Sequence, residues 1–112
     1  MSIVTQGIRD LVKKAIADNK VMVFSKSYCP YCMRAKDLFD DLDVDYKAIE
    51  LNEVNDGEAI QKALAQLTKQ NTVPNIFIGQ KHVGGADALN SLFASGKLKT
   101  LLNEAGISDA KL

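Results

Sequence analysis

Both cysteines of the chain lie in one four-residue segment, Cys29-Pro30-Tyr31-Cys32. Two residues separate them, and the apolar run Val21–Phe24 comes shortly before. Pro30 suits the first position of a helix, because that position needs no backbone N–H partner. A cysteine pair with this spacing, after a strand and at the start of a helix, indicates a centre for thiol–disulfide exchange.

Cys29 is expected at the N-cap of the helix that begins with Pro30. Unpaired N–H groups and the positive end of the helix dipole favour an anion at this position. Cys29 is therefore the expected nucleophile, because the thiolate is the form of cysteine that attacks a disulfide. Cys32 lies one turn further along the same helix, where its sulfur is expected to reach Cys29 and close a disulfide.

Zinc binding is the alternative interpretation of a close cysteine pair. Structural zinc sites use four ligands. The chain offers two cysteines and its single histidine, His82, which is distant in the sequence. The number of ligands therefore argues against a zinc site within one chain, and we expect no metal. His82 is expected to be a surface or partly packed residue and not a general base.

The elements that position the cysteines follow from the spacing of apolar residues. Helical spacing predicts a helix over about 5–18 and four more, marked by apolar residues within 35–42, 60–67, 89–93 and 98–105. Short apolar runs predict strands at 21–25, 45–51, 75–78 and 81–83. Asn55-Asp56-Gly57 is a turn and capping signal, Gly79-Gln80 a hairpin turn, and Gly84-Gly85 is expected to break the chain.

This order predicts an α/β fold with a four-stranded mixed sheet flanked by about five helices. The first two strands are joined through a helix, so they should be parallel with a right-handed crossover. The last two strands should form a hairpin. Ligands on such sheets lie beyond the carboxyl ends of the parallel strands. Cys29 falls at that place, just after the first strand.

Composition indicates one globular domain over 1–112, with a loose tail at about 107–112. Hydrophobic residues make up 46% and charged residues 25%, and 14 Lys and Arg balance 14 Asp and Glu. A net charge of zero argues against a nucleic-acid partner, and no apolar run approaches the length of a membrane span. The N-terminus lacks the pattern of a secretory signal. We therefore expect a cytoplasmic protein, in a reducing compartment, that is a monomer.

Three motifs together resemble the dithiol glutaredoxins of the thioredoxin-fold superfamily. They are Phe24–Cys32, Thr72-Val73-Pro74 and Gly84-Gly85-Ala86-Asp87, in the order and spacing of that family. The resemblance covers nearly the whole chain and implies a thioredoxin-like fold with glutathione as co-substrate. It implies that Cys29 attacks glutathione mixed disulfides and that Cys32 is needed only where an internal disulfide forms. The implied roles are in electron transport and cell redox homeostasis.

The resemblance also implies a glutathione-binding groove beside Cys29. Its expected members are Lys26, Tyr31, Gln70, Thr72, Val73, Pro74, Gly85, Ala86 and Asp87.

Each part of this groove has an expected role. Lys26 would favour the thiolate and pair with a carboxylate of glutathione, while Tyr31 would pack beside the ligand. Pro74 resembles a cis-proline that leaves the backbone of Val73 free to pair with glutathione as an added strand. The N–H groups of Ala86 and Asp87 would hold the γ-glutamyl carboxylate at a helix N-terminus.

Simpler interpretations stay open beside these roles. Lys26 is also explained as a solvated lysine at a strand end, Pro74 as the start of a strand, and Asp87 as a helix cap. Gln70 resembles a family position that contacts the glycyl carboxylate of glutathione. Asn71 stands where many relatives carry arginine or lysine, and this departure is expected to weaken that contact.

The expected function is a glutathione-dependent thiol–disulfide oxidoreductase that acts on glutathionylated and disulfide-containing proteins. A thioredoxin-type enzyme is the close rival, but Tyr28 and Pro30-Tyr31 differ from the residues typical of that active site. A dimer that holds a [2Fe–2S] cluster through the first cysteine and glutathione is the alternative from another class. Pro30 resembles the variants of the motif that usually do not bind such a cluster. A binding module without activity is the third interpretation.

Overall fold

The computed structural model describes residues 3–112. Its elements, in chain order, are α1 (Gln6–Asp18), β1 (Val21–Ser25), α2 (Pro30–Asp41), β2 (Lys47–Glu50), α3 (Gly57–Thr68), β3 (Asn75–Ile78), β4 (Lys81–Gly84), α4 (Ala86–Ser95) and α5 (Lys97–Glu104). Every helix and strand expected from the apolar spacing is present in the described residues.

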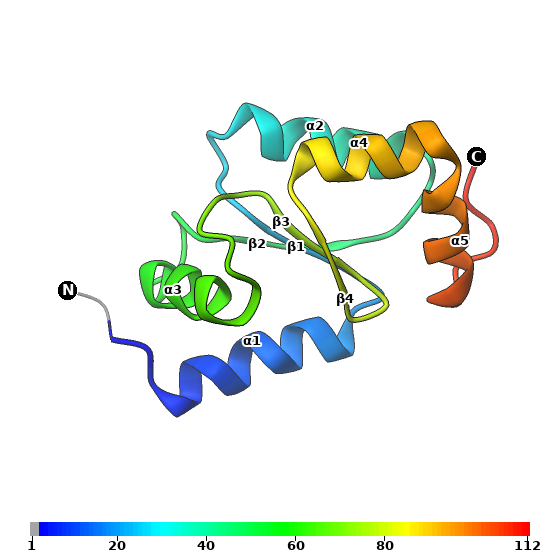
Figure 1. Ribbon diagram of the computed structural model, residues 1–112. Coiled ribbons are helices and arrows are strands. Elements are labelled where there is room, and N and C mark those ends of the chain that lie inside the picture. Colours follow the sequence, from blue (N-terminus) through cyan, green and yellow to red (C-terminus); the bar gives the residue numbers. More distant parts are fainter. Residues whose placement is uncertain (1–2) are drawn as a thin grey trace.

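The four strands form one mixed sheet in the order β2-β1-β3-β4. β1 and β2 are parallel, whereas β3 is antiparallel to both β1 and β4. Helices α1 and α3 cover one face of the sheet, and α2, α4 and α5 cover the other (Figure 1). The predicted α/β fold, with a mixed sheet and helices on both faces, is confirmed.

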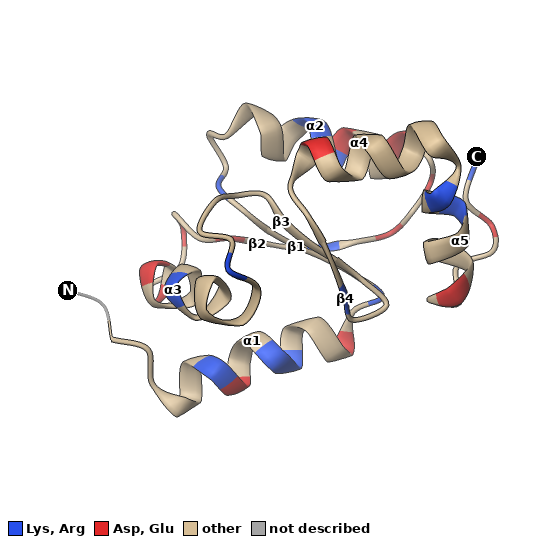
Figure 2. Cartoon of the chain, viewed as in Figure 1, with Lys and Arg blue, Asp and Glu red and all other residues tan. Residues whose placement is uncertain are grey.

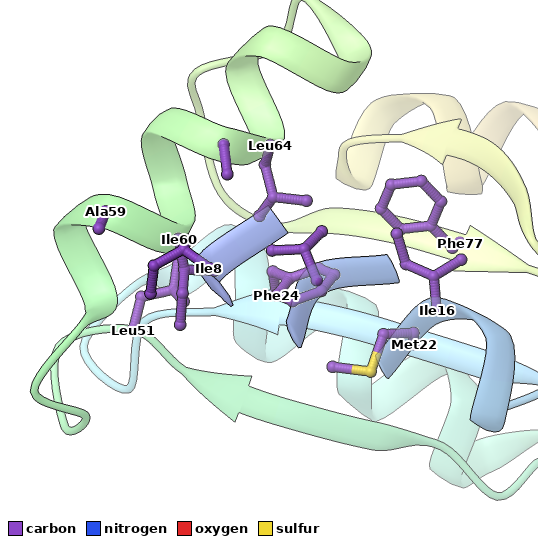
Figure 3. Packing of buried hydrophobic residues seen from close by; sticks show 11 residues of the cluster. Ile8, Ile16, Met22, Phe24, Leu51, Ala59, Ile60, Leu64 and Phe77 are labelled. Atoms are coloured by element: carbon purple, nitrogen blue, oxygen red, sulfur yellow. The ribbon is translucent and has the colours of Figure 1, made fainter. Parts of the chain in front are cut away.

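Each face of the sheet carries its own apolar core. Side chains alternate along β1, so Met22 and Phe24 point toward α1 and α3, while Val21 and Val23 point toward α2. On the first face the ring of Phe24 meets that of Phe77 edge to face, with centroids 6.0 Å apart (Figure 3). Because both faces are covered, β1 is buried along its whole length, and it holds the following loop firmly.

Three local features differ from the sequence-based expectation. The second strand spans only Lys47–Glu50, within the expected 45–51. Asp56 occupies the N-cap of α3, but its side chain makes no capping hydrogen bond. The last strand runs one residue beyond the expected 81–83, to Gly84 at φ +119°, and the expected break before α4 falls at Gly85, the N-cap residue.

The C-terminal segment 107–112 contacts the core, contrary to the loose tail that we expected. The Ile107 and Ala110 side chains pack against the core beside α2 and α5. The N–H of Lys111 donates to the carbonyl of Leu42 at 2.8 Å, and its ammonium pairs with Asp43 at 2.8 Å. Two partly buried apolar residues, three positions apart in the sequence, therefore attach a segment whose polar composition suggested a loose tail.

Charges of both signs alternate over the helices and loops (Figure 2). Blue and red segments follow one another along α1 and α3 and around α5, in agreement with the zero net charge. Among residues 3–112, no helix is both long enough and apolar enough to cross a membrane.

Candidate active site

Three loops meet where β1 ends and β3 begins. They are 26–32, 70–74 and 84–87, and we call this region the cysteine end of the sheet. In Figure 1 it lies on the side away from α5 and the C-terminus. β1 delivers the first loop, the start of β3 ends the second, and the end of β4 leads into the third.

Cys29 is the N-cap of α2, as predicted. Its Sγ accepts a hydrogen bond from the N–H of Cys32 at 3.3 Å, and Pro30 occupies the first helical turn. The N–H of Cys29 donates to the carbonyl of Lys26 at 3.0 Å, which fixes the loop before the helix. The sulfur is partly exposed. The helix end therefore presents a partly exposed nucleophile and offers its sulfur a backbone donor.

Cys32 lies in a different environment, one turn further into α2. Its side chain is completely buried. Burial raises the pKa of the Cys32 thiol, and its contact with Cys29 raises it further. The two sulfurs are therefore unequal. Cys29 is placed to attack a substrate, whereas Cys32 is shielded from solvent and its thiol form is favoured.

The loop before β3 brings its backbone to the first sulfur. The Val73–Pro74 peptide is cis, as the resemblance implied. The Sγ of Cys29 lies 3.8 Å from the carbonyl oxygen of Val73, to which the thiol donates. Thr72 is exposed and Val73 half-buried, so a partly accessible stretch of backbone borders the reactive sulfur.

The side chain of Gln70 stabilises this loop through hydrogen bonds to its backbone. Its Nε2 donates to the carbonyl of Thr72 at 3.1 Å and to that of Pro74 at 2.9 Å. A carboxamide has two N–H donors, and both are engaged within the chain. The expected contact of Gln70 with a carboxylate stays a prediction, and it would require one of these bonds to open.

The third loop opens α4 without a side-chain cap. Gly85 is the N-cap residue and makes no capping bond, so the alternative role of Asp87 as the cap is wrong. Ala86 is buried and Asp87 exposed in the first turn. A Cβ at Gly84 would lie 3.2 Å from that of Ala88, and the backbone at φ +119° favours glycine. The first N–H groups of α4 remain available to an anion.

Lys26 lines a small depression of about 160 Å³ beside the start of the loop that leads to Cys29. The remaining lining residues are Tyr28, Leu51, Asn52, Gly57, Glu58 and Gln61. Gln61 was not identified from the sequence, and it also donates to the carbonyl of Asn71 at 2.8 Å. Its position in the middle of an amphipathic helix gave no signal, because only the fold brings α3 beside the loop of Lys26.

Tyr31 is exposed, with the guanidinium of Arg34 5.2 Å from the centre of its ring. This distance permits a cation–π contact, which holds the ring along the first turn of α2. No hydrogen bond or ring contact in the described residues joins Tyr31 to the 70–74 loop. Its place beside a bound ligand therefore stays a prediction.

His82 takes no part in this arrangement. Its Nε2 lies 2.9 Å from Oδ1 of Asn75, and its ring contacts that of Phe77. Burial lowers the pKa of His82. Within residues 3–112, no group of three or more His, Cys, Asp and Glu side chains is placed to hold a metal ion.

Sequence comparison identifies close relatives over most of the chain. The family model described as Glutaredoxin matches residues 21–83. A glutaredoxin of Solanum lycopersicum is 53% identical over 94 residues, which are 84% of this chain and 87% of that protein. Glutaredoxin-C2 of Arabidopsis thaliana is 51% identical over 94 residues, which are 84% of this chain and 85% of that protein.

Solved structures agree with this assignment. A buckwheat glutaredoxin–glutathione complex superposes with a TM-score of 0.85 at 45% identity, covering 92% of this chain and 97% of that one. Wheat glutaredoxin gives a TM-score of 0.87 at 48% identity, covering 94% of this chain and 97% of that one. The thioredoxin-like fold and the thiol–disulfide oxidoreductase class are thereby confirmed. Since the family model spans more than half of the chain, both cysteines included, this chain belongs to the glutaredoxin family.

Proposed function

We propose that the protein reduces mixed disulfides of glutathione through Cys29 alone, and some protein disulfides through Cys29 and Cys32 together. The observation that carries this proposal is the inequality of the two sulfurs. Cys29 is partly exposed at a helix N-terminus, with a backbone N–H on its sulfur, whereas Cys32 is buried behind it. One sulfur suffices for a reaction completed by free glutathione, and the second serves a reaction that ends in an internal bond.

In the first reaction the Cys29 thiolate attacks the glutathione sulfur of a mixed disulfide. The substrate leaves as a thiolate and takes up a proton, while Cys29 becomes glutathionylated. A second glutathione thiolate attacks that glutathione sulfur, releases the Cys29 thiolate and forms glutathione disulfide. One free glutathione is thus oxidised for each mixed disulfide reduced, and it leaves joined to the glutathione of the substrate as glutathione disulfide. Cys32 takes no part.

In the second reaction Cys29 attacks a protein disulfide and forms a mixed disulfide with one substrate sulfur. Cys32 then loses its proton and attacks the sulfur of Cys29. The substrate departs as a dithiol, and a Cys29–Cys32 disulfide remains. Two molecules of glutathione reduce that disulfide and are oxidised to glutathione disulfide.

Glutathione is the proposed co-substrate because of the backbone around Cys29. The partly exposed backbone at Val73, next to the Cys29 sulfur, suits strand addition by a peptide, and the uncapped start of α4 suits a carboxylate. The buckwheat glutaredoxin, which is similar over 92% of this chain, was solved as a complex with glutathione. Lys26 is the cation of the loop that leads to Cys29, where its carbonyl accepts from the Cys29 N–H.

Two cysteine variants test the proposal. With the mixed disulfide of glutathione and mercaptoethanol, we expect Cys29→Ser to lose at least ~10³-fold in kcat/KM, and Cys32→Ser to stay within about threefold of wild type. With insulin disulfides, both variants should be inactive. Equal thermal unfolding of the three proteins is the control for folding.

Other results would contradict the proposal. Loss of both activities in Cys32→Ser would overturn the division of labour between the sulfurs. An inactive wild type, or a stable brown dimer with [2Fe–2S] absorption bands after purification without oxygen, would favour the cluster-binding alternative.

A further inference from the structure

Four residues behind the active site form two neighbouring pairs. Ser25 and Glu50 are register partners at the ends of the parallel strands β1 and β2, so their side chains leave the same face of the sheet. This face is the one covered by α2, because Val23 and Ala48, two residues earlier on each strand, pack in the core of α2. Cys32 and Lys36 are four residues apart on α2. They therefore lie one turn apart on the same side of the helix, with their Cβ atoms about 5–6 Å from each other.

Each helix residue meets one of the strand residues. The side chain of Ser25 contacts the thiol of Cys32 and favours its ionised form. The ammonium of Lys36 pairs with Oε2 of Glu50 at 3.0 Å. Lys36 and Glu50 therefore stand beside Cys32 and Ser25, at the same end of the sheet.

The Lys36–Glu50 pair is unusual among the ion pairs of residues 3–112. Its side chains are only 19% and 20% exposed, whereas the Lys81–Glu104 pair is 61% and 50% exposed. Oε1 of Glu50 is buried and has no hydrogen-bond partner among residues 3–112. Burying a pair of charges with an unsatisfied oxygen costs stability. Packing therefore does not explain why these charges lie between α2 and the sheet.

Lys36 is a permanent cation at this place. Burial alone would lower its pKa, but the bond to Glu50, together with the fields of Tyr46 and Cys32, raises the pKa of Lys36 above its ordinary value. The other charged groups around the pair are Asp37 and Asp40, which act on Tyr46. Lys36 is the cation one turn from Cys32 on α2, and its partner Glu50 lies beside Ser25 in the register of the two strands.

We propose that Lys36, positioned by Glu50, stabilises the Cys32 thiolate while the Cys29–Cys32 disulfide closes. This inference rests on the dithiol reaction proposed above. In that step Cys32 gives its proton to solvent and attacks the sulfur of Cys29. The bond between Cys29 and the substrate sulfur breaks, and the substrate thiolate leaves and takes up a proton. A fixed ammonium lowers the cost of a buried thiolate, which is otherwise the obstacle to this step.

A single-turnover measurement isolates this step. The enzyme is glutathionylated at Cys29 with glutathione disulfide at low pH, and release of glutathione is followed after a jump to pH 6–9. We expect Lys36→Met to close its disulfide ~10-fold more slowly at pH 7, with the inflection of the rate moved to higher pH by about one unit. Glu50→Gln, which frees Lys36 to turn toward solvent, should slow closure about threefold. Lys36→Arg keeps the charge and should keep the wild-type inflection.

Three controls separate this effect from a structural one. Lys81→Met removes the exposed cation of a distant pair and should leave the closure rate unchanged. In a Cys32→Ser background, Lys36→Met should leave turnover of the glutathione mixed disulfide unchanged, because Cys32 is absent. Thermal unfolding of each variant shows whether it is folded. If Lys36→Met does not fold, Lys36→Arg still tests the role of the charge.

The outcomes distinguish two failures. If wild-type enzyme releases no glutathione on its own, the dithiol reaction is wrong and this inference falls with it. If the wild type closes its disulfide and Lys36→Met matches it in rate and inflection, the dithiol reaction stands and the role of Lys36 is refuted.

Discussion

Both ends of the sheet are hollowed at the surface, and the larger depression lies away from the cysteines. We call the opposite region, 18–20 with 43–47 and 106–111, the far end. Its depression measures about 680 Å³ and is lined by residues from all three of these segments. At the cysteine end, the depression beside Lys26 measures about 160 Å³. Size therefore does not mark the reactive end of this molecule.

The two ends differ in how the chain uses its backbone groups. At the far end the chain bonds to itself: the N–H of Gly79 donates to Lys20 at 2.7 Å, and that of Lys111 donates to Leu42 at 2.8 Å. At the cysteine end, α2 is capped by a sulfur and α4 by no side chain. The far end is thus closed by its own bonds, while the cysteine end presents donors to an incoming anion. Changes at the far end should alter stability alone, and changes at the cysteine end should also alter activity.

The largest stability effect is expected for Gly57→Ala, at the cysteine end. A Cβ at Gly57 would overlap the carbonyl of Leu51, whose N–H donates to Ser25 at the end of β1 at 2.7 Å. The backbone must shift to accept the methyl group, and we expect a loss of about 2–3 kcal/mol in the free energy of unfolding. Urea denaturation measures this loss, and glutathione-dependent turnover should fall with it.

Gly7→Ala is the matched control, because Gly7 also lies in the first turn of a helix. A Cβ there would meet only Oγ1 of Thr5 at an ordinary 3.7 Å. Alanine should therefore stabilise α1 by about 0.5 kcal/mol without a change in turnover. Equal effects of the two substitutions would mean that close packing at Gly57 does not constrain the cysteine end.

Gln70→Met should separate activity from stability at the cysteine end. The substitution keeps the length of the side chain but removes both donors to the carbonyls of Thr72 and Pro74. A looser loop beside Cys29 should raise KM for the glutathione mixed disulfide by ~10-fold, and kcat should change less. Steady-state kinetics measures both constants.

The bonds of Gln70 also distinguish two roles for this residue. If Gln70 only stabilises the loop, Gln70→Met should weaken the binding of every glutathione mixed disulfide to the same degree. If it contacts the glycyl carboxylate, substrates whose glycyl carboxylate is amidated should be insensitive to the substitution. The second result would show that one internal bond opens when the ligand binds.

The fold was largely predictable because apolar spacing determines it. β1 and β3 have the predicted bounds, and Cys29 occupies the predicted N-cap. Local signals suffice there: β1 is an unbroken apolar run, and Pro30 marks the start of α2. The residues near the sulfur were predictable for the same reason, since two of the three site segments follow the ends of strands and the third leads directly into β3.

The remaining features depend on pairs that only the tertiary fold creates. The Lys36–Glu50 pair joins α2 to β2 through the register of the parallel strands, and no spacing in the sequence encodes that register. Gln61 reaches the loop of Lys26 for a similar reason. The segment 107–112 was expected to be loose because its polar residues conceal two apolar contacts, Ile107 and Ala110.

Ile107→Ala tests the far end. Its side chain is half-buried against the core beside α5, so its truncation should cost about 1 kcal/mol of unfolding free energy. Turnover should stay at the wild-type value, because Ile107 lies at the far end of the sheet. Lys111→Met is the control: its pair with Asp43 is exposed and screened by solvent, so thermal unfolding should not change measurably. A loss of turnover in Ile107→Ala would break the separation between the two ends.

The smallest expected effect concerns His82, in the hairpin that runs between the two ends. Burial lowers the pKa of its imidazole below the ordinary value of about 6.5. The unfolded chain therefore binds a proton more readily than the folded one. The contribution of His82 to stability is fully present above about pH 6.5 and is lost as the pH falls toward the lower folded pKa.

His82→Gln should remove this part of the pH dependence. Because the ring is partly exposed, the loss of stability between pH 7.5 and 5.5 should shrink by less than ~0.5 kcal/mol relative to wild type. His82 is the single histidine of the chain, so one imidazole titration in the NMR spectrum measures its pKa directly. Turnover should follow the wild-type pH profile, since the imidazole lies on β4 and bonds to Asn75. A shifted pH profile of turnover would instead connect His82 to the cysteine end, through Asn75 and the loop 70–74 that precedes it.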